Sequence, residues 1–166
     1  MWWSDRRGFL SLAAAATLAL AGCGFTPVYA PGAAATQLQN AVLVDEPVDR
    51  ESYVLVRQLE QRLGRAEAPR YGLSLALDLK QERMAITASN ITTRFNLIGQ
   101  VAYALRDLDG GKVLISGNAQ SFTGYSATGS TAATQAARRD AAERLMTILA
   151  DQISTRLMAG AGALVP

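Results

Sequence analysis

The chain has 166 residues, a formal net charge of +2 and no histidine. The missing histidine excludes imidazole-based catalysis and imidazole-bound metals. The near-neutral balance argues against nucleic acid as the main partner, since that partner requires a strong basic field. Cys23 is the single cysteine, so no intramolecular disulfide can form and the fold must be stabilised by packing. The length suits one domain with a single core.

The first 22 residues have the three parts of a secretory signal peptide. Arg6 and Arg7 give a basic start, residues 9–20 form an apolar run, and Leu20-Ala21-Gly22-Cys23 resembles the bacterial lipobox. The run is too short to cross a bilayer, which takes roughly 20 residues. We therefore expect removal of residues 1–22 and lipidation of the Cys23 thiol. A buried cysteine at the end of an Ala-rich helix is the alternative interpretation.

The N-terminal segment also indicates the export pathway and the membrane that would hold the protein. The segment Asp5-Arg6-Arg7-Gly8-Phe9-Leu10 resembles a twin-arginine export motif, but general secretory signals also carry arginines, so both routes stay open. Gly24 stands where an aspartate would mark inner-membrane retention, which favours the outer membrane. Cleavage leaves 166 − 22 = 144 residues with a net charge of +1, because Asp5, Arg6 and Arg7 are removed. The acylated cysteine would then anchor the protein in outer-membrane lipid.

The segment after the cysteine predicts a tether, a strand and a helix. Residues 23–38 hold two prolines and two glycines without any apolar period, which indicates a flexible tether. Residues 41–44 form a short apolar run that suits a buried strand. Asp49 is a good N-cap, leucines recur at every fourth position up to residue 63, and Gly64 is a stop signal. A helix is expected between Asp49 and Gly64.

Two stretches of alternating apolar and polar residues predict long strands. The first starts at Tyr71 and weakens after Gln81, and residues 88–90 are turn-like. The second repeats the alternation from Phe95 over about fourteen residues, which is long for a strand. Gly99 is therefore expected to mark a bulge or bend.

Asp109-Gly110-Gly111 predicts a hairpin into a third strand. A two-residue loop would put Val101 opposite Asn118, whereas a three-residue loop pairs Leu108 with Lys112. We favour the three-residue loop because it keeps one face apolar and the other polar and open. Its expected pairs are Leu105 with Ile115, Tyr103 with Gly117, Val101 with Ala119 and Phe95 with Tyr125.

The C-terminal part predicts a long amphipathic helix. Ser130 or Thr131 can cap it, Gly160 ends it, and residues 161–166 are expected to fray. Its apolar stripe consists of Ala142, Leu145, Leu149, Ile153 and Leu157. Residues 39–160 would then form a single α+β domain. We expect a two-layer sandwich in which a four-stranded mixed sheet, a short strand plus a three-stranded antiparallel meander, carries two helices on one face.

Catalytic chemistry has little support in the sequence. The close carboxylate pairs, Asp107 with Asp109 and Asp45 with Glu46, lie at expected turns and strand ends, where local structure explains them. No Gly-rich phosphate loop precedes a helix. We therefore expect no enzyme, no cofactor and no metal. A periplasmic hydrolase is the alternative from a different functional class.

Three stretches carry a family resemblance: LAGCGFTPVYAP at residues 20–31, PVDRESYVLVRQLEQRLG at 47–64 and DAAERLMTILADQISTRL at 140–157. With the meander between them, they resemble the alphaproteobacterial branch of the LptE family of lipopolysaccharide-assembly lipoproteins over residues 20–158. The resemblance implies a lipoprotein on the periplasmic side of the outer membrane. It also implies an α/β sandwich that plugs the LptD β-barrel, assists its assembly and binds lipopolysaccharide during delivery to the cell surface. An accessory lipoprotein of another envelope transport system is the alternative.

Arg83 and Arg94 are the candidate contacts to lipopolysaccharide. They flank the tip of the expected hairpin, where loops are free to meet a ligand. Lipopolysaccharide carries phosphates, and a guanidinium binds phosphate through two parallel hydrogen bonds. Most loop arginines are merely solvated, so the assignment is a hypothesis.

Overall fold

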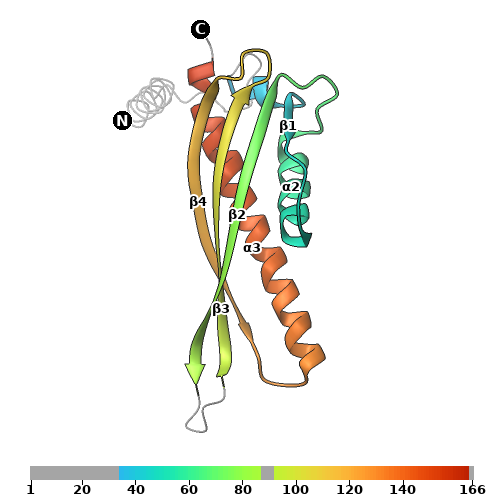
Figure 1. Ribbon diagram of the computed structural model, residues 1–166, viewed down its shortest axis with the longest axis vertical. Helices are drawn as coiled ribbons and strands as arrows, with labels where there is room; N and C mark the ends of the chain where they lie inside the picture. The colour runs from blue at the N-terminus through green and yellow to red at the C-terminus, as the bar shows by residue number, and fades with distance from the viewer. Residues whose placement is uncertain (1–33, 87–91, 165–166) are drawn as a thin grey trace, which may run out of the picture.

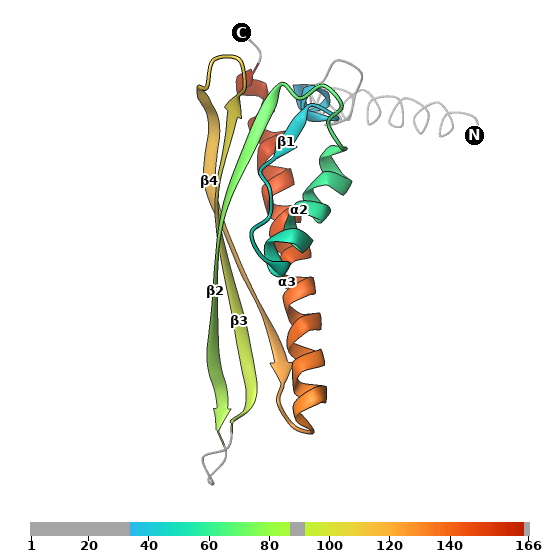
Figure 2. The same cartoon turned by 45° about the vertical axis from the view of Figure 1, so that its right-hand side comes forward.

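The computed structural model describes residues 34–86 and 92–164; the signal peptide, Cys23 and the expected turn at 88–90 lie outside them. The sheet has the order β1-β2-β3-β4, with β1 parallel to β2 and the other neighbours antiparallel. Both helices cover one face of this sheet (Figure 2), which confirms the predicted two-layer α+β sandwich. The elements are η1 (Ala34–Leu38), β1 (Val42–Val44), α2 (Arg50–Leu63), β2 (Tyr71–Ile86), β3 (Thr92–Asp107), β4 (Val113–Ser126), α3 (Thr131–Gly160) and η2 (Ala161–Leu164).

The sandwich is elongated. Strands β2 and β3 have 16 residues each, which corresponds to about 50 Å at about 3.3 Å per residue. Helix α3, with 30 residues, runs beneath most of this length, whereas α2 covers only the half near β1 (Figure 1). We call the end with η1, η2 and the β3–β4 turn the proximal end, and the end with the β2–β3 hairpin tip and the start of α3 the distal end.

The predicted register of β3 and β4 is confirmed. Leu105 faces Ile115, Tyr103 faces Gly117, Val101 faces Ala119 and Phe95 faces Tyr125. The Tyr103 ring lies over Gly117, where an added Cβ would meet the hydroxyl oxygen at 2.6 Å. A glycine is therefore needed at this position.

The turn itself differs from the prediction. The Asp107 amide donates to the Lys112 carbonyl at 2.9 Å, and Arg106 pairs with Val113, so Leu108 and Lys112 are not partners. The loop is one residue longer than expected, and a bulge at Leu114 restores the register. The cause lies in tertiary structure, because the Leu108 amide donates to the Arg70 carbonyl of the segment before β2 at 3.0 Å.

Gly99 does not form a bulge. It pairs in regular register with Leu79 and with Ser121, so the bulge that the sequence suggested at this position is absent. An added Cβ would lie 2.9 Å from Leu149 Cδ1 and 3.1 Å from Leu145 Cδ2. The glycine therefore allows α3 to approach the sheet closely.

Capping residues position both helices as predicted. The Asp49 side chain accepts a hydrogen bond from the Ser52 amide at 2.6 Å, and the Ser52 hydroxyl accepts one from the Asp49 amide at 2.9 Å, which completes a capping box. Ser130 caps α3 by accepting from the Ala133 amide at 3.2 Å. These local bonds set where each helix begins.

The core lies between the sheet and the two helices, and it extends further than the sequence suggests. Residues 34–38, expected to be tether, form η1, in which Ala35 and Leu38 are buried. Residues 161–164, expected to fray, form η2, in which Ala161 is buried. The α3 stripe is buried as predicted, from Ala142 to Leu157.

Candidate functional site

Neither helix covers the sheet face turned away from them, which we call the open face (Figure 2). Because side chains alternate between the two faces of a strand, even-numbered residues of β2, β3 and β4 occupy this face along most of its length. Two rows in the proximal half of this face contain only small or neutral polar side chains. These rows are Ser74, Ala104 and Ser116, and next to them Ala76, Ala102 and Asn118.

Toward the distal end the open face carries a groove with a volume of about 380 Å³. We call it the distal groove. It is lined by Asn96, Ile98, Gln120, Ser121 and Phe122. Ile98 and Phe122 are cross-strand partners, and Phe122 is 64% exposed. An aromatic ring thus lies open to solvent beside Ile98, with an amide side chain in the row on either side of it.

Gly124 shapes the distal side of this groove. An added Cβ would lie 3.3 Å from Asn96 Oδ1 and 3.6 Å from Arg94 Nε. The bare backbone at Gly124 lets both side chains lie across β4. The Arg94 guanidinium therefore borders the groove beside Asn96.

The structure does not bring the two candidate arginines together. Arg83 pairs with Phe95, whose ring stacks on buried Tyr125 at a centroid distance of 5.4 Å on the helix-facing side. Arg94 is the neighbour of Phe95 along β3 and therefore points to the opposite, open face. Both side chains are exposed. A ligand lying on one face of the sheet would meet only one of them.

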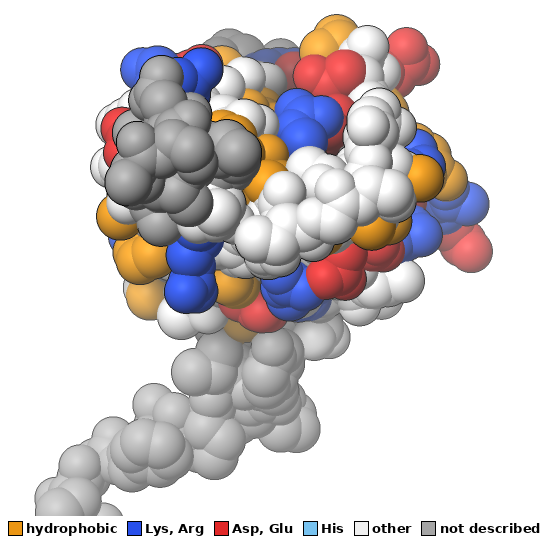
Figure 3. All heavy atoms as spheres, turned by 90° about the horizontal axis from the view of Figure 1, so that it is seen from below, with side chains coloured by type: hydrophobic (Ala, Val, Ile, Leu, Met, Phe, Trp, Pro, Cys, Tyr) orange, Lys and Arg blue, Asp and Glu red, His pale blue; other side chains and the backbone are white. Residues whose placement is uncertain are grey.

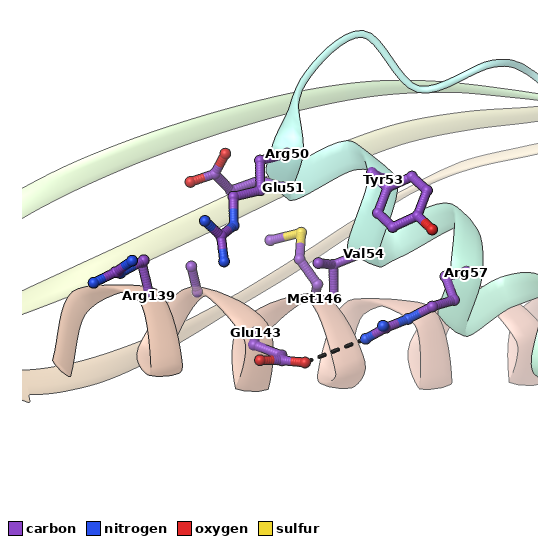
Figure 4. A pocket seen from close by; sticks show the side chains of 9 residues that line it. Arg50, Glu51, Tyr53, Val54, Arg57, Arg139, Glu143 and Met146 are labelled. Carbon is purple, nitrogen blue, oxygen red and sulfur yellow. Dashed lines mark hydrogen bonds and ion pairs between the residues drawn. The ribbon is translucent and has the colours of Figure 1, made fainter. Parts of the chain in front are cut away.

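A second hollow, of about 200 Å³, lies between the start of α2 and the middle of α3 (Figure 4). Arg57 reaches across it to Glu143, with 3.2 Å between Nη2 and Oε1, while Arg139 points away from the other labelled side chains (Figure 4). The two carboxylates of this hollow offset most of the charge of its three guanidiniums. Its lining is Arg50, Glu51, Tyr53, Val54, Arg57, Arg139, Ala142, Glu143 and Met146. The Arg57–Glu143 ion pair links α2 to α3 across this hollow.

Titratable chemistry is sparse in the described part of the chain. Hydrogen bonds from Ser52 lower the pKa of the Asp49 carboxyl below its ordinary value, and this group caps a helix. Among residues 34–86 and 92–164, no three acidic, cysteine or histidine side chains come close enough to hold a metal ion.

Basic and acidic side chains are intermixed around the distal end (Figure 3). The exposed surface there suits recognition through mixed polar contacts.

The described helices include none that is both long enough and apolar enough to cross a membrane. Residues 37–157 match the LptE family, described as lipopolysaccharide-assembly. The chain belongs to the LptE family. This match confirms the family resemblance found in the sequence. No curated protein sequence matches the chain significantly.

Solved structures share the LptE-type sandwich. A lipoprotein from Caulobacter crescentus CB15 is 23% identical, with a TM-score of 0.67 over 80% of this chain and 98% of its own. The rare lipoprotein B from Shewanella oneidensis is 12% identical, with a TM-score of 0.58 over 75% and 96%. Lipoprotein B from Nitrosomonas europaea is 16% identical, with a TM-score of 0.57 over 74% and 84%. At these low sequence identities, the similarity to the three structures supports a shared fold alone.

Sequence reasoning missed the distal groove, although a signal for it is present. The alternation in β4 places Asn118, Gln120 and Phe122 on the same face. A phenylalanine at a position assigned to the polar face breaks the pattern. Such a break marks a candidate binding residue on an LptE-type sheet.

Proposed function

We propose that this protein is a lipoprotein on the periplasmic side of the outer membrane, anchored through acylated Cys23. In this proposal it plugs the LptD-type β-barrel, helps that barrel to assemble, and binds lipopolysaccharide on its way to the cell surface. The single observation that carries the proposal is the match to the lipopolysaccharide-assembly family over residues 37–157. The role is one of binding and assembly without catalysis.

The dimensions of the sandwich support the plug role. Its long strands extend about 50 Å, while the apolar band of an outer-membrane barrel is about 25 Å tall. A domain of this length can therefore pass through the barrel from one side to the other. The termini of the described chain lie together at the proximal end (Figure 1), so a short lipid anchor at Cys23 would hold that end near the membrane.

The open face supports the same role. The lumen of an outer-membrane barrel is polar, and two rows in the proximal half of this face are small and uncharged, as in Ala76, Ala102 and Asn118. Small side chains allow close approach of a second surface, and the amide can hydrogen-bond to polar groups of a lumen wall. Arg94, and separately Arg83 on the other face, would contribute contacts to lipopolysaccharide phosphates.

Affinity purification tests the proposal. A tagged full-length protein is extracted from membranes in mild detergent, and the bound proteins and lipids are identified. We expect an integral β-barrel protein of the LptD type together with lipopolysaccharide, and neither with an equally tagged, unrelated outer-membrane lipoprotein. Recovery of a different envelope transport complex would contradict the proposal and support the alternative lipoprotein role.

Site-specific photocrosslinking refines this test. A photoreactive side chain at exposed Ala102 should crosslink to the barrel protein, because the open face would lie against the lumen wall. The same group at buried Leu105, on the opposite face of the same strand, serves as the matched control. Equal crosslinking at both positions would show that the contact is not made by the open face.

A further inference from the structure

We propose that the distal groove is a saccharide-binding site in which a pyranose ring stacks on Phe122. The groove of about 380 Å³ lies within the range of about 300–1,000 Å³ that is usual for ligand sites. Assigning the sugar to lipopolysaccharide rests on the proposed function. The existence of the site rests on the geometry alone.

The aromatic ring is placed to receive a sugar. Phe122 is 64% exposed, and Ile98, directly across on β3, supports it from the side. The C–H groups on one face of a pyranose carry slight positive charge, and the face of an aromatic ring carries slight negative charge. Contact between these two faces removes apolar surface from water without burying any hydroxyl.

Amide side chains lie where the edge of such a ring would extend. Gln120 lies two residues from Phe122 on the same strand and face, and Asn96 lies two residues from Ile98. Each amide offers both donors and an acceptor, which matches hydroxyl groups that both donate and accept. The bare backbone at Gly124 lets the Asn96 side chain lie across β4 at the edge of the groove.

The surrounding charges select a sugar over an isolated phosphate. None of the five lining residues is charged. In the neighbouring strand, Lys80 is paired with Asp78 at 3.2 Å, and Glu82 lies across from Asn96, where it would repel an anion. Arg94 forms no ion pair within the described residues and borders the groove beyond Asn96. An acidic substituent on the sugar would therefore be directed toward Arg94.

The test is equilibrium binding to the full-length acylated protein in detergent. One probe is lipopolysaccharide core oligosaccharide freed of lipid A, and the other is a muropeptide disaccharide, because both glycans occur in the periplasm. We expect Phe122→Ala to weaken oligosaccharide binding about tenfold, as loss of one aromatic contact implies. Phe122→Tyr should retain binding. Val113→Ala is the matched control, since Val113 is an exposed apolar residue at the proximal end of the same strand.

Each outcome has a defined meaning. Binding of the muropeptide alone, lost in Phe122→Ala, would support the saccharide site and assign its sugar to the cell wall. Absence of binding of either glycan, or equal effects of Phe122→Ala and Val113→Ala, would overturn the site. Co-purification of the barrel with Phe122→Ala is measured separately, because the proposed function can hold even if the groove binds no sugar.

Discussion

The contact between Gly99 and Leu149 allows a quantitative test of how α3 packs on the sheet. Leu149 is fully buried, so Leu149→Ala should lower the free energy of unfolding by about 2–5 kcal/mol, which combines the lost transfer energy with the cavity left behind. Gly99→Ala should also destabilise the protein, by about 1–3 kcal/mol, because the new methyl group would lie 2.9 Å from Leu149 Cδ1.

The double variant tests the contact itself. Leu149→Ala removes the Cδ1 atom that the new methyl group at position 99 would meet, so the combined loss should be smaller than the sum of the single losses. The expected coupling is about 0.5–3 kcal/mol. The relief is partial, because Leu145 Cδ2 would still lie 3.1 Å from the added Cβ.

Urea unfolding of a lipid-free form, residues 24–166, provides the measurement. Both tryptophans are at positions 2 and 3, so the transition is followed by far-ultraviolet circular dichroism. Arg138→Ala is the control, since Arg138 is exposed and its loss should cost under about 0.5 kcal/mol. Strictly additive effects, or equal losses in Arg138→Ala and Leu149→Ala, would refute the assigned packing.

Three further predictions concern the anchor, a helix cap and the candidate phosphate contacts. Cys23→Ser should leave an uncleaved or soluble protein, because a hydroxyl cannot replace the thiolate; metabolic labelling with palmitate checks this, and an acylated variant would exclude the lipobox. Asp49→Ala should cost about 0.5–2 kcal/mol at neutral pH. Because hydrogen bonds from Ser52 lower the pKa of Asp49, its contribution is present above its unfolded pKa, about 3.9. It is lost as the pH falls through the lower folded pKa, so unfolding curves of the two proteins should converge on acidification. Replacing both Arg83 and Arg94 by Ala should weaken lipopolysaccharide binding and reduce its salt dependence; unchanged affinity in this double variant would place the phosphate contacts elsewhere.

Local patterns were sufficient to predict the register of β3 with β4 and both helix starts. The alternation around Tyr103 and Gly117 has one register that keeps the core apolar, and Asp49 carries its own capping signal. The role of Gly99 could not be predicted, because its reason is a helix that lies fifty residues later in the chain. Likewise, Leu38 is buried only because tertiary contacts reach beyond the predicted domain.

The separation of the two candidate arginines follows from alternation along each strand. Counting from buried Leu73 places Arg83 on the helix-facing side, counting from Phe95 places Arg94 on the open face, and the register shift between β2 and β3 comes only after Arg83. Arg83 and Arg94 appear as a symmetric pair in the sequence, and the structure places them on opposite faces. The exposed ring of Phe122 was visible in the sequence as a break in polarity, but its significance depends on the amides that neighbouring positions contribute.

The unequal lengths of the two helices have a consequence for motion. Helix α2 covers the sheet only from the proximal end to about the middle of the sandwich (Figure 1). The buried residues of α3 begin only at Ala141, ten residues after the start of that helix. The distal part therefore has fewer buried apolar contacts per strand than the proximal part, and elements with few such contacts open at lower free energy. The proximal half should act as a rigid base, while the distal half can adjust its shape to whatever encloses it.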